Sequence, residues 1–316
     1  APSCYHFHIF IAPQREKIFS PEWIIKLIEW VNTVLQGILT GGLYALFAAG
    51  LAIIFGVMRL VNITHGDLIV LSAFVAMVAI DVMGFNPFIS LVAVLPIMFV
   101  FGYILQRSIL NFTLGDDLLP PLLVTFGLSI VIQNLLLQIF SADSQRIKAG
   151  SLEILSIQLY ENLSVGVFPL IVFIVAVFII IGLQYLFSNT RIGRAFRATS
   201  DDAVTAQLMG INDRHIFSLS MALALLIVGI AGLFVGISTN FDPSAGPSRL
   251  LFAFEAVIMG GLGSLWGTLA GGIILGVSQN IGAKLDPGWQ ILAGHIAFLV
   301  ILVFRPNGLF PRMRDD

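Results

Sequence analysis

Long apolar runs without a charged residue restrict the fold of this chain more than any other feature. Residues 33–57 and 167–187 contain no Asp, Glu, Lys or Arg, and each run is as long as the roughly 20 residues with which an α-helix crosses a bilayer. Charged residues make up 11% of the chain, whereas a soluble domain carries about a quarter. Because so few charges cannot cover a water-soluble surface, we predict an all-α polytopic membrane protein.

The same pattern predicts about 8–9 transmembrane helices in total. The stretch 250–283 is apolar but is broken by the glycine-rich segment 260–267. Lipid tolerates such a break only where the backbone is buried in protein or lines a cavity. The remaining predicted spans are 68–82, 88–105, 120–140, 216–238 and 289–304.

The distribution of Arg and Lys predicts how the chain is oriented in the membrane, because these residues gather in cytoplasmic loops. The loop 188–215 and the tail 305–316 are basic and are predicted to be cytoplasmic, which places the loop 141–165 outside. The stretch 250–283 must then cross an even number of times. We predict two antiparallel pieces hinged at the glycines, either a re-entrant pair or two short spans.

The N-terminal part differs from the rest of the chain. Residues 1–32 are predicted to form a tail and an amphipathic helix at the membrane interface, ahead of a transmembrane domain at 33–304. Ile24, Leu27 and Ile28 share one helical face, and Trp23 and Trp30 suit the interface.

Composition also argues against several classes of site. Cys4 is the single cysteine, so an intrachain disulfide is excluded. His6 and His8 lack further ligands nearby, and we predict no metal site. The formal net charge of −2 gives no sign of a nucleic-acid partner.

The loop 188–215 contains regularly spaced arginines followed by helix-capping residues. Arg191, Arg194 and Arg197 recur every three residues, so a helix holds them on one broad face. Basic residues in such a loop also follow from topology alone. The signals described next favour a docking element for a soluble partner.

Helix-capping residues follow the three arginines. Ser200 is predicted to cap a helix of two to three turns, with Asp201 and Asp202 in its first turn, where negative charge is favourable. Gly210 is predicted to end this helix in a left-handed conformation. A capped helix between two spans looks like a lever on which a partner acts.

Ionisable residues are scarce inside the predicted spans, which argues against an ion-coupled transporter. Glu255 and His295 are the main exceptions. Glu255 either lines a path or pairs with another helix. Ser264 and His295 do not match the surroundings of an intramembrane serine protease. A phosphate-binding loop is absent from the sequence, so any ATP hydrolysis would belong to another chain.

Four motifs together resemble a known family. Residues 193–212, with Gly-Arg-Ala-x-Arg-Ala and a later Leu-x-Gly-Ile-Asn, resemble the coupling segment of permease subunits of branched-chain amino acid ABC importers. Residues 61–67, Val-Asn-Ile-Thr-His-Gly-Asp, resemble that family's Asn-x-x-His-Gly signature. Residues 260–272 and 305–308 resemble its late glycine-rich segment and its ending. The resemblance covers about residues 33–310.

The resemblance implies a permease fold and a set of partners. A second, related permease subunit, two ATP-binding subunits and an external solute-binding protein would complete the importer in a prokaryotic cytoplasmic membrane. No cofactor is expected on this chain, and ATP with Mg²⁺ would bind the partner subunits. The family carries branched-chain amino acids, other amino acids, urea or short amides. A stand-alone channel is the alternative from another class.

Two sets of residues are predicted to serve transport. Asn62 and His65 either shape the pathway or belong to the start of a helix, where Asp67 would lie in the first turn. The predicted coupling residues are Arg191, Gly193, Arg194, Arg197, Asp201, Asp202, Ala206, Leu208 and Gly210. The predicted pathway residues are Asn62, His65, Glu255, Gly260, Gly261 and Gly263.

Overall fold

The computed structural model describes residues 22–310 except 85, 116, 118, 161 and 162. Seven helical segments in this part of the chain are long and apolar enough to cross a membrane, which confirms a polytopic helical protein. The predictions for residues 1–21 and 311–316 lie outside the described residues. The spanning helices are α1 (Glu22–Met58), α2 (His65–Met83), α3 (Pro87–Ser108), α4 (Leu119–Phe140), α5 (Val167–Asn189), α8 (Asp213–Ser238) and α11 (Gln290–Phe304), with short 3-10 turns η1 (Leu110–Phe112) and η3 (Pro287–Trp289).

The glycine-rich break divides the stretch 250–283 into two helices, as predicted. These are α9 (Gly246–Gly260) and α10 (Leu265–Leu285), and the chain bends by 119° between them. Gly261 and Gly263 have φ angles of 106° and 81°, which side chains other than glycine rarely adopt. With 15 residues, α9 is about 22 Å long and too short to cross the bilayer alone.

Helix α1 is longer than predicted. It runs without interruption through 37 residues, so the predicted boundary at residue 32 falls inside it. The sequence between Glu22 and Gln36 contains no glycine or proline that would end a helix. Lys284 of α10 contacts this extension in two ways. Its Nζ forms an ion pair with Glu29 Oε2 at 3.6 Å and lies over the face of the Trp30 ring.

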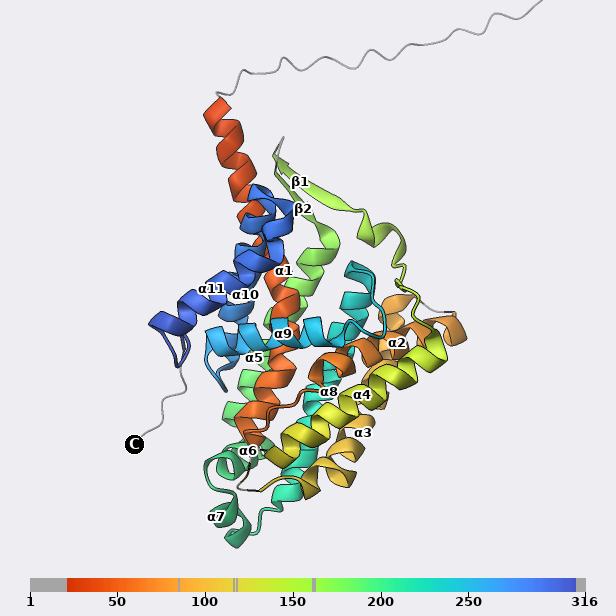
Figure 1. Ribbon diagram of the computed structural model, residues 1–316, viewed down its shortest axis with the longest axis vertical. Helices are drawn as coiled ribbons and strands as arrows, with labels where there is room; N and C mark the ends of the chain where they lie inside the picture. Colours follow the sequence, from red (N-terminus) through yellow and green to blue (C-terminus); the bar gives the residue numbers. More distant parts are fainter. Residues whose placement is uncertain (1–21, 85, 116, 118, 161–162, 311–316) are drawn as a thin grey trace, which may run out of the picture.

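Helices α1 and α10 pack closely along their lengths (Figure 1). A Cβ atom added to Gly41 would lie 2.5 Å from the Cα of Ile273, and one added to Gly272 would lie 2.7 Å from the carbonyl oxygen of Gly41. Small residues allow this approach of two backbones, which stabilises helix pairs in lipid. Helices α5, α8 and α9 also pack on α1, whereas α2 and α3 pack on α8.

The loop 141–165 is more ordered than the sequence suggested. It contains η2 (Gly150–Glu153) and an antiparallel hairpin of β1 (Ser156–Tyr160) and β2 (Leu163–Gly166). The side chain of Gln36 in α1 donates to the Ser164 carbonyl at 2.7 Å. The hairpin therefore packs beside α1, and this small sheet is added to the predicted helical architecture.

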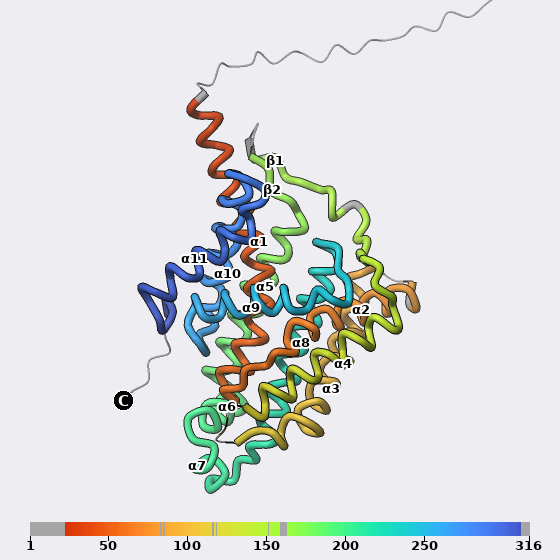
Figure 2. Tube along the Cα trace, in the orientation of Figure 1, coloured from red at the N-terminus to blue at the C-terminus, as the bar shows by residue number. Residues whose placement is uncertain are grey.

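Two short helices occupy the opposite end of the molecule from the hairpin (Figure 2). They are α6 (Arg191–Asp201) and α7 (Ala203–Leu208), which lie between the spans α5 and α8. The predicted orientation requires this separation, with the loop 141–165 outside and the loop 188–215 in the cytoplasm.

Candidate functional site

Helix α6 is amphipathic and packs on the ends of the spans. Thr190 caps it by accepting a hydrogen bond from the Gly193 N–H at 3.0 Å. Phe196 is buried and stacks on Phe187 of α5, with 5.3 Å between the ring centroids. Arg191 and Arg194 are exposed, and Arg197 is half-buried. The three arginines therefore belong to one helix, as predicted, whose apolar side faces the membrane domain.

The position of the next cap differs from the prediction. Ser200 does not cap a helix; α6 continues through Asp201, and the Ser200 hydroxyl donates to the Gly56 carbonyl at 2.6 Å. Asp202 is the cap, because its Oδ1 accepts from the N–H groups of Val204 and Thr205 at 2.9 and 3.1 Å. The prediction of Ser200 as the cap was therefore wrong by two positions, because helix α6 continues through residue 201.

Helix α7 is shorter than the predicted two to three turns, with six residues. Gly210 has a φ angle of 85° just after the helix, as predicted. Ala206 is buried, whereas Val204, Leu208 and Met209 are 69%, 82% and 80% exposed. The element formed by α6 and α7 (the coupling element) therefore ends in a small apolar tip.

Removing the cap of α7 should loosen this tip. Hydrogen bonds from Thr205 lower the pKa of Asp202. Because the folded-state pKa is the lower one, the capping contribution is present at neutral pH and is lost as the pH falls through that pKa. We expect Asp202→Ala to speed amide hydrogen exchange at Val204 and Thr205 at pH 7, while Asp202→Asn, which keeps a side-chain acceptor, changes it little. Equal protection in Asp202→Ala would contradict this role.

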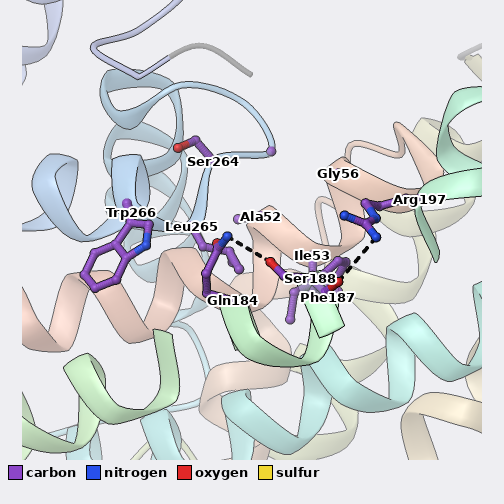
Figure 3. A pocket seen from close by; sticks show the side chains of 11 residues that line it. Ala52, Ile53, Gly56, Gln184, Phe187, Ser188, Arg197, Ser264, Leu265 and Trp266 are labelled. Carbon is purple, nitrogen blue, oxygen red and sulfur yellow. Dashed lines mark hydrogen bonds between the residues drawn. The ribbon is translucent and has the colours of Figure 1, made fainter. Parts of the chain in front are cut away.

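A cavity of about 300 Å³ connects the coupling element to the bend between α9 and α10 (Figure 3). Arg197 of α6 donates to the Ser188 carbonyl at 3.5 Å, and Gln184 donates to the Ser188 hydroxyl at 3.2 Å. Gly263 and Ser264 line the same cavity from the bend. Two segments that were predicted separately therefore meet at one cavity.

Helix α2 begins deep in the membrane domain. The ring Nε2 of His65 lies 2.8 Å from the Phe47 carbonyl, and Phe47 precedes the end of α1 at Met58 by 11 residues (58 minus 47), or about 16 Å. The buried Asn62 accepts from the Thr64 N–H at 3.1 Å. Two roles were predicted for these residues, in the transport pathway or at the start of a helix. The contact of Asn62 is that of a helix start, and the contact of His65 is that of packing between α2 and α1.

The start of α2 crosses the start of α9 at close range. A Cβ atom on Gly66 would lie 2.0 Å from the Gly246 carbonyl oxygen. Asp67 is buried in the first turn of α2, and it accepts hydrogen bonds from Ser129 at 2.5 Å and Gln133 at 2.8 Å. These two α4 residues were missed by the sequence analysis. Asp67 therefore joins α4 to the crossing of α2 and α9.

The other predicted pathway residues lie elsewhere. Glu255 of α9 is 2% exposed and bonds to the ring Nδ1 of His295 in α11, which matches the predicted alternative of pairing with another helix. The carbonyl of Gly260 accepts from the Phe310 N–H at 2.9 Å. The structure does not gather Asn62, His65, Glu255 and the glycines of the bend into one cluster.

Comparison of the sequence with known proteins identifies the family of this chain. The family described as branched-chain amino acid transport system / permease component matches residues 33–304. The chain belongs to this permease family. The resemblance inferred from the motifs is thereby confirmed over most of the chain, and with it an ABC permease fold.

Curated relatives match most of this permease. The high-affinity branched-chain amino acid permease BraD of Pseudomonas aeruginosa is 29% identical over 91% of this chain and 97% of its own. The high-affinity branched-chain amino acid permease LivH of Escherichia coli is 24% identical over 91% of this chain and 97% of its own. The fructose import permease FrcC of Rhizobium meliloti is 30% identical over 77% of this chain and 68% of its own. The relatives are thus named for substrates of two chemical classes.

Proposed function

We propose that this permease is the membrane subunit of an ATP-driven importer for branched-chain or related amino acids. A second permease subunit, two ATP-binding subunits and an external solute-binding protein would complete it, in a prokaryotic cytoplasmic membrane. ATP and Mg²⁺ would bind the partner subunits. The observation that supports this best is the coupling element, which ends in an exposed apolar tip at the end of the molecule opposite the hairpin.

The coupling element has the features of a lever. Its apolar tip suits a groove in a soluble partner, and its buried side is fixed to α5 through Phe196 and Phe187. Movement of the partner would shift α6, and the cavity at Arg197 gives a route to the bend between α9 and α10. Such a movement would alternate access between the two sides of the membrane.

The partners are tested by purifying the tagged permease from its native cell. We expect an ATP-binding subunit and a second permease to co-purify. A permease that emerged alone, and vesicles that leaked small solutes without ATP, would favour a channel instead. Uptake of urea, a short amide or fructose, in place of leucine, would reassign the substrate within the same machinery.

A point change in the tip sharpens this experiment. Leu208→Glu places a charge on the apolar tip, and we expect it to release the ATP-binding subunits while the second permease stays bound. Ile154→Glu is the control, because Ile154 is 86% exposed in the loop at the other end. Retention of the ATP-binding subunits by Leu208→Glu would contradict docking through α7.

A further inference from the structure

The connection between α8 and α9 carries polar groups into the membrane domain. It pairs with the outer loop where the backbones of Gln145 and Phe241 exchange hydrogen bonds. It then reaches Gly246, beside the start of α2. Thr239, Asn240 and Ser244 are exposed along this connection. The inner end of the connection therefore lies within the membrane domain, where polar groups face protein or water and not lipid.

Arg249 lies at the inner end of this polar segment, in the first turn of α9. It donates one hydrogen bond, from Nη2 to the Thr239 hydroxyl at 3.1 Å. Its Nε is buried and has no partner in the described part of the chain, and no ion pair with a described carboxylate forms. Lys284, by contrast, lies near the end of α10 and is paired with Glu29. Arg249 is therefore a cation at membrane depth whose charge is not neutralised by direct contact.

The unpaired donors of Arg249 suit a carboxylate. An unpaired guanidinium is costly to hold away from bulk water, and a carboxylate is the group that its planar fork binds best. Asp242 is near enough to interact electrostatically, but it forms no ion pair with Arg249 among the described residues, and its Oδ1 accepts from the Ser244 N–H and hydroxyl. Tyr44 also interacts with Arg249, and its hydroxyl donates to Gln279 at 2.5 Å. The free donors of Arg249 thus stay available to a ligand.

We propose that Arg249 binds the carboxylate of the amino acid as it passes through the outer half of the permease. This inference rests on the proposed function and adds a substrate contact to it. It also separates substrate classes, because a neutral sugar has no carboxylate for Arg249 to receive. Residue 249 lies between the predicted span 216–238 and the predicted stretch 250–283, so it was not predicted to belong to a helix.

The test uses the complete importer in proteoliposomes, with leucine as the substrate. Arg249→Gln should lower leucine uptake at least about tenfold, as expected for the loss of a charged hydrogen-bonding pair. ATP hydrolysis stimulated by the loaded binding protein should stay within about twofold of wild type, because the coupling element is intact. A purely structural role would lower assembly and hydrolysis together. Lys284→Gln removes an equal charge and should leave uptake unchanged.

A conservative variant covers the case in which Arg249→Gln does not assemble. Arg249→Lys keeps the charge without the planar fork, and we expect uptake between that of wild type and that of the glutamine variant. Wild-type leucine uptake by Arg249→Gln, or by Arg249→Lys when only that variant assembles, would overturn the inference. A wild-type importer that carried no amino acid would instead remove the proposed function, and the inference with it.

Discussion

Gly66→Ala is expected to prevent the permease from reaching its folded state. The new methyl group would lie 2.0 Å from the Gly246 carbonyl oxygen and 2.8 Å from the Leu250 backbone nitrogen. Backbone atoms of α9 cannot yield as a flexible side chain can, so α2 and α9 must separate. Overpacking of this kind costs about 3 kcal/mol or more, a large part of the stability of a typical protein. Folded protein in detergent extracts, followed by fluorescence-detected size exclusion, should fall sharply.

The control for this change is Gly127→Ala in α4, where a Cβ atom would have nothing within 4 Å. We expect it to be neutral or slightly stabilising, because alanine favours a helix over glycine by up to about 1 kcal/mol. The same yield and thermal midpoint for Gly66→Ala and wild type would show that the crossing of α2 and α9 is not as close as described.

Gly193→Ala should produce the second large effect, on coupling instead of folding. Its methyl group would lie 2.1 Å from the Leu186 carbonyl oxygen and 2.6 Å from the Phe187 Cα. Helix α6 would have to move off α5, and the stacking of Phe196 on Phe187 would be lost. Helix α6 contacts the spans α1, α5 and α8 only at their ends, so we expect an assembled importer that hydrolyses ATP with little uptake.

The measurement is the ratio of leucine transported to ATP hydrolysed in proteoliposomes. Gly182→Ala in α5 is the matched control, since a Cβ atom there would meet nothing within 4 Å. We expect the ratio to fall at least about tenfold in Gly193→Ala, because a displaced lever no longer moves the spans with the partner. An unchanged ratio would remove α6 from the coupling path.

The hydropathy pattern and the positions of the glycines were sufficient to predict the spans and the bend, because a backbone in lipid must form its hydrogen bonds internally as a helix. The chain bends at 260–267 as predicted, since Gly261 and Gly263 adopt conformations suited to glycine. Capping was harder to predict. Ser200 and Asp202 are comparable caps, and the packing of α6 on the spans decided between them.

Contacts between distant helices were the least predictable part of the site. Thr125, Ser129 and Gln133 recur every four residues on α4, and their side chains bond to residues 63–67 at the start of α2. This spacing shows in the sequence that one face of α4 is polar, but it does not show which helix that face contacts. Arg249 was hidden for a similar reason, because α9 begins right after a turn-rich segment that reads as a loop.

The pairing of α1 with α10 affects the order in which the protein can be made. Gly37 packs against Val277, and these residues are separated by 240 positions (277 minus 37) along the chain. At the usual rate of synthesis, about 5–20 residues per second, α10 is synthesised about 10–50 s after α1. During that time lipid or the insertion machinery must cover its glycine-lined face. Biogenesis therefore depends on α1 remaining stable as a lone helix, which its apolar surface permits.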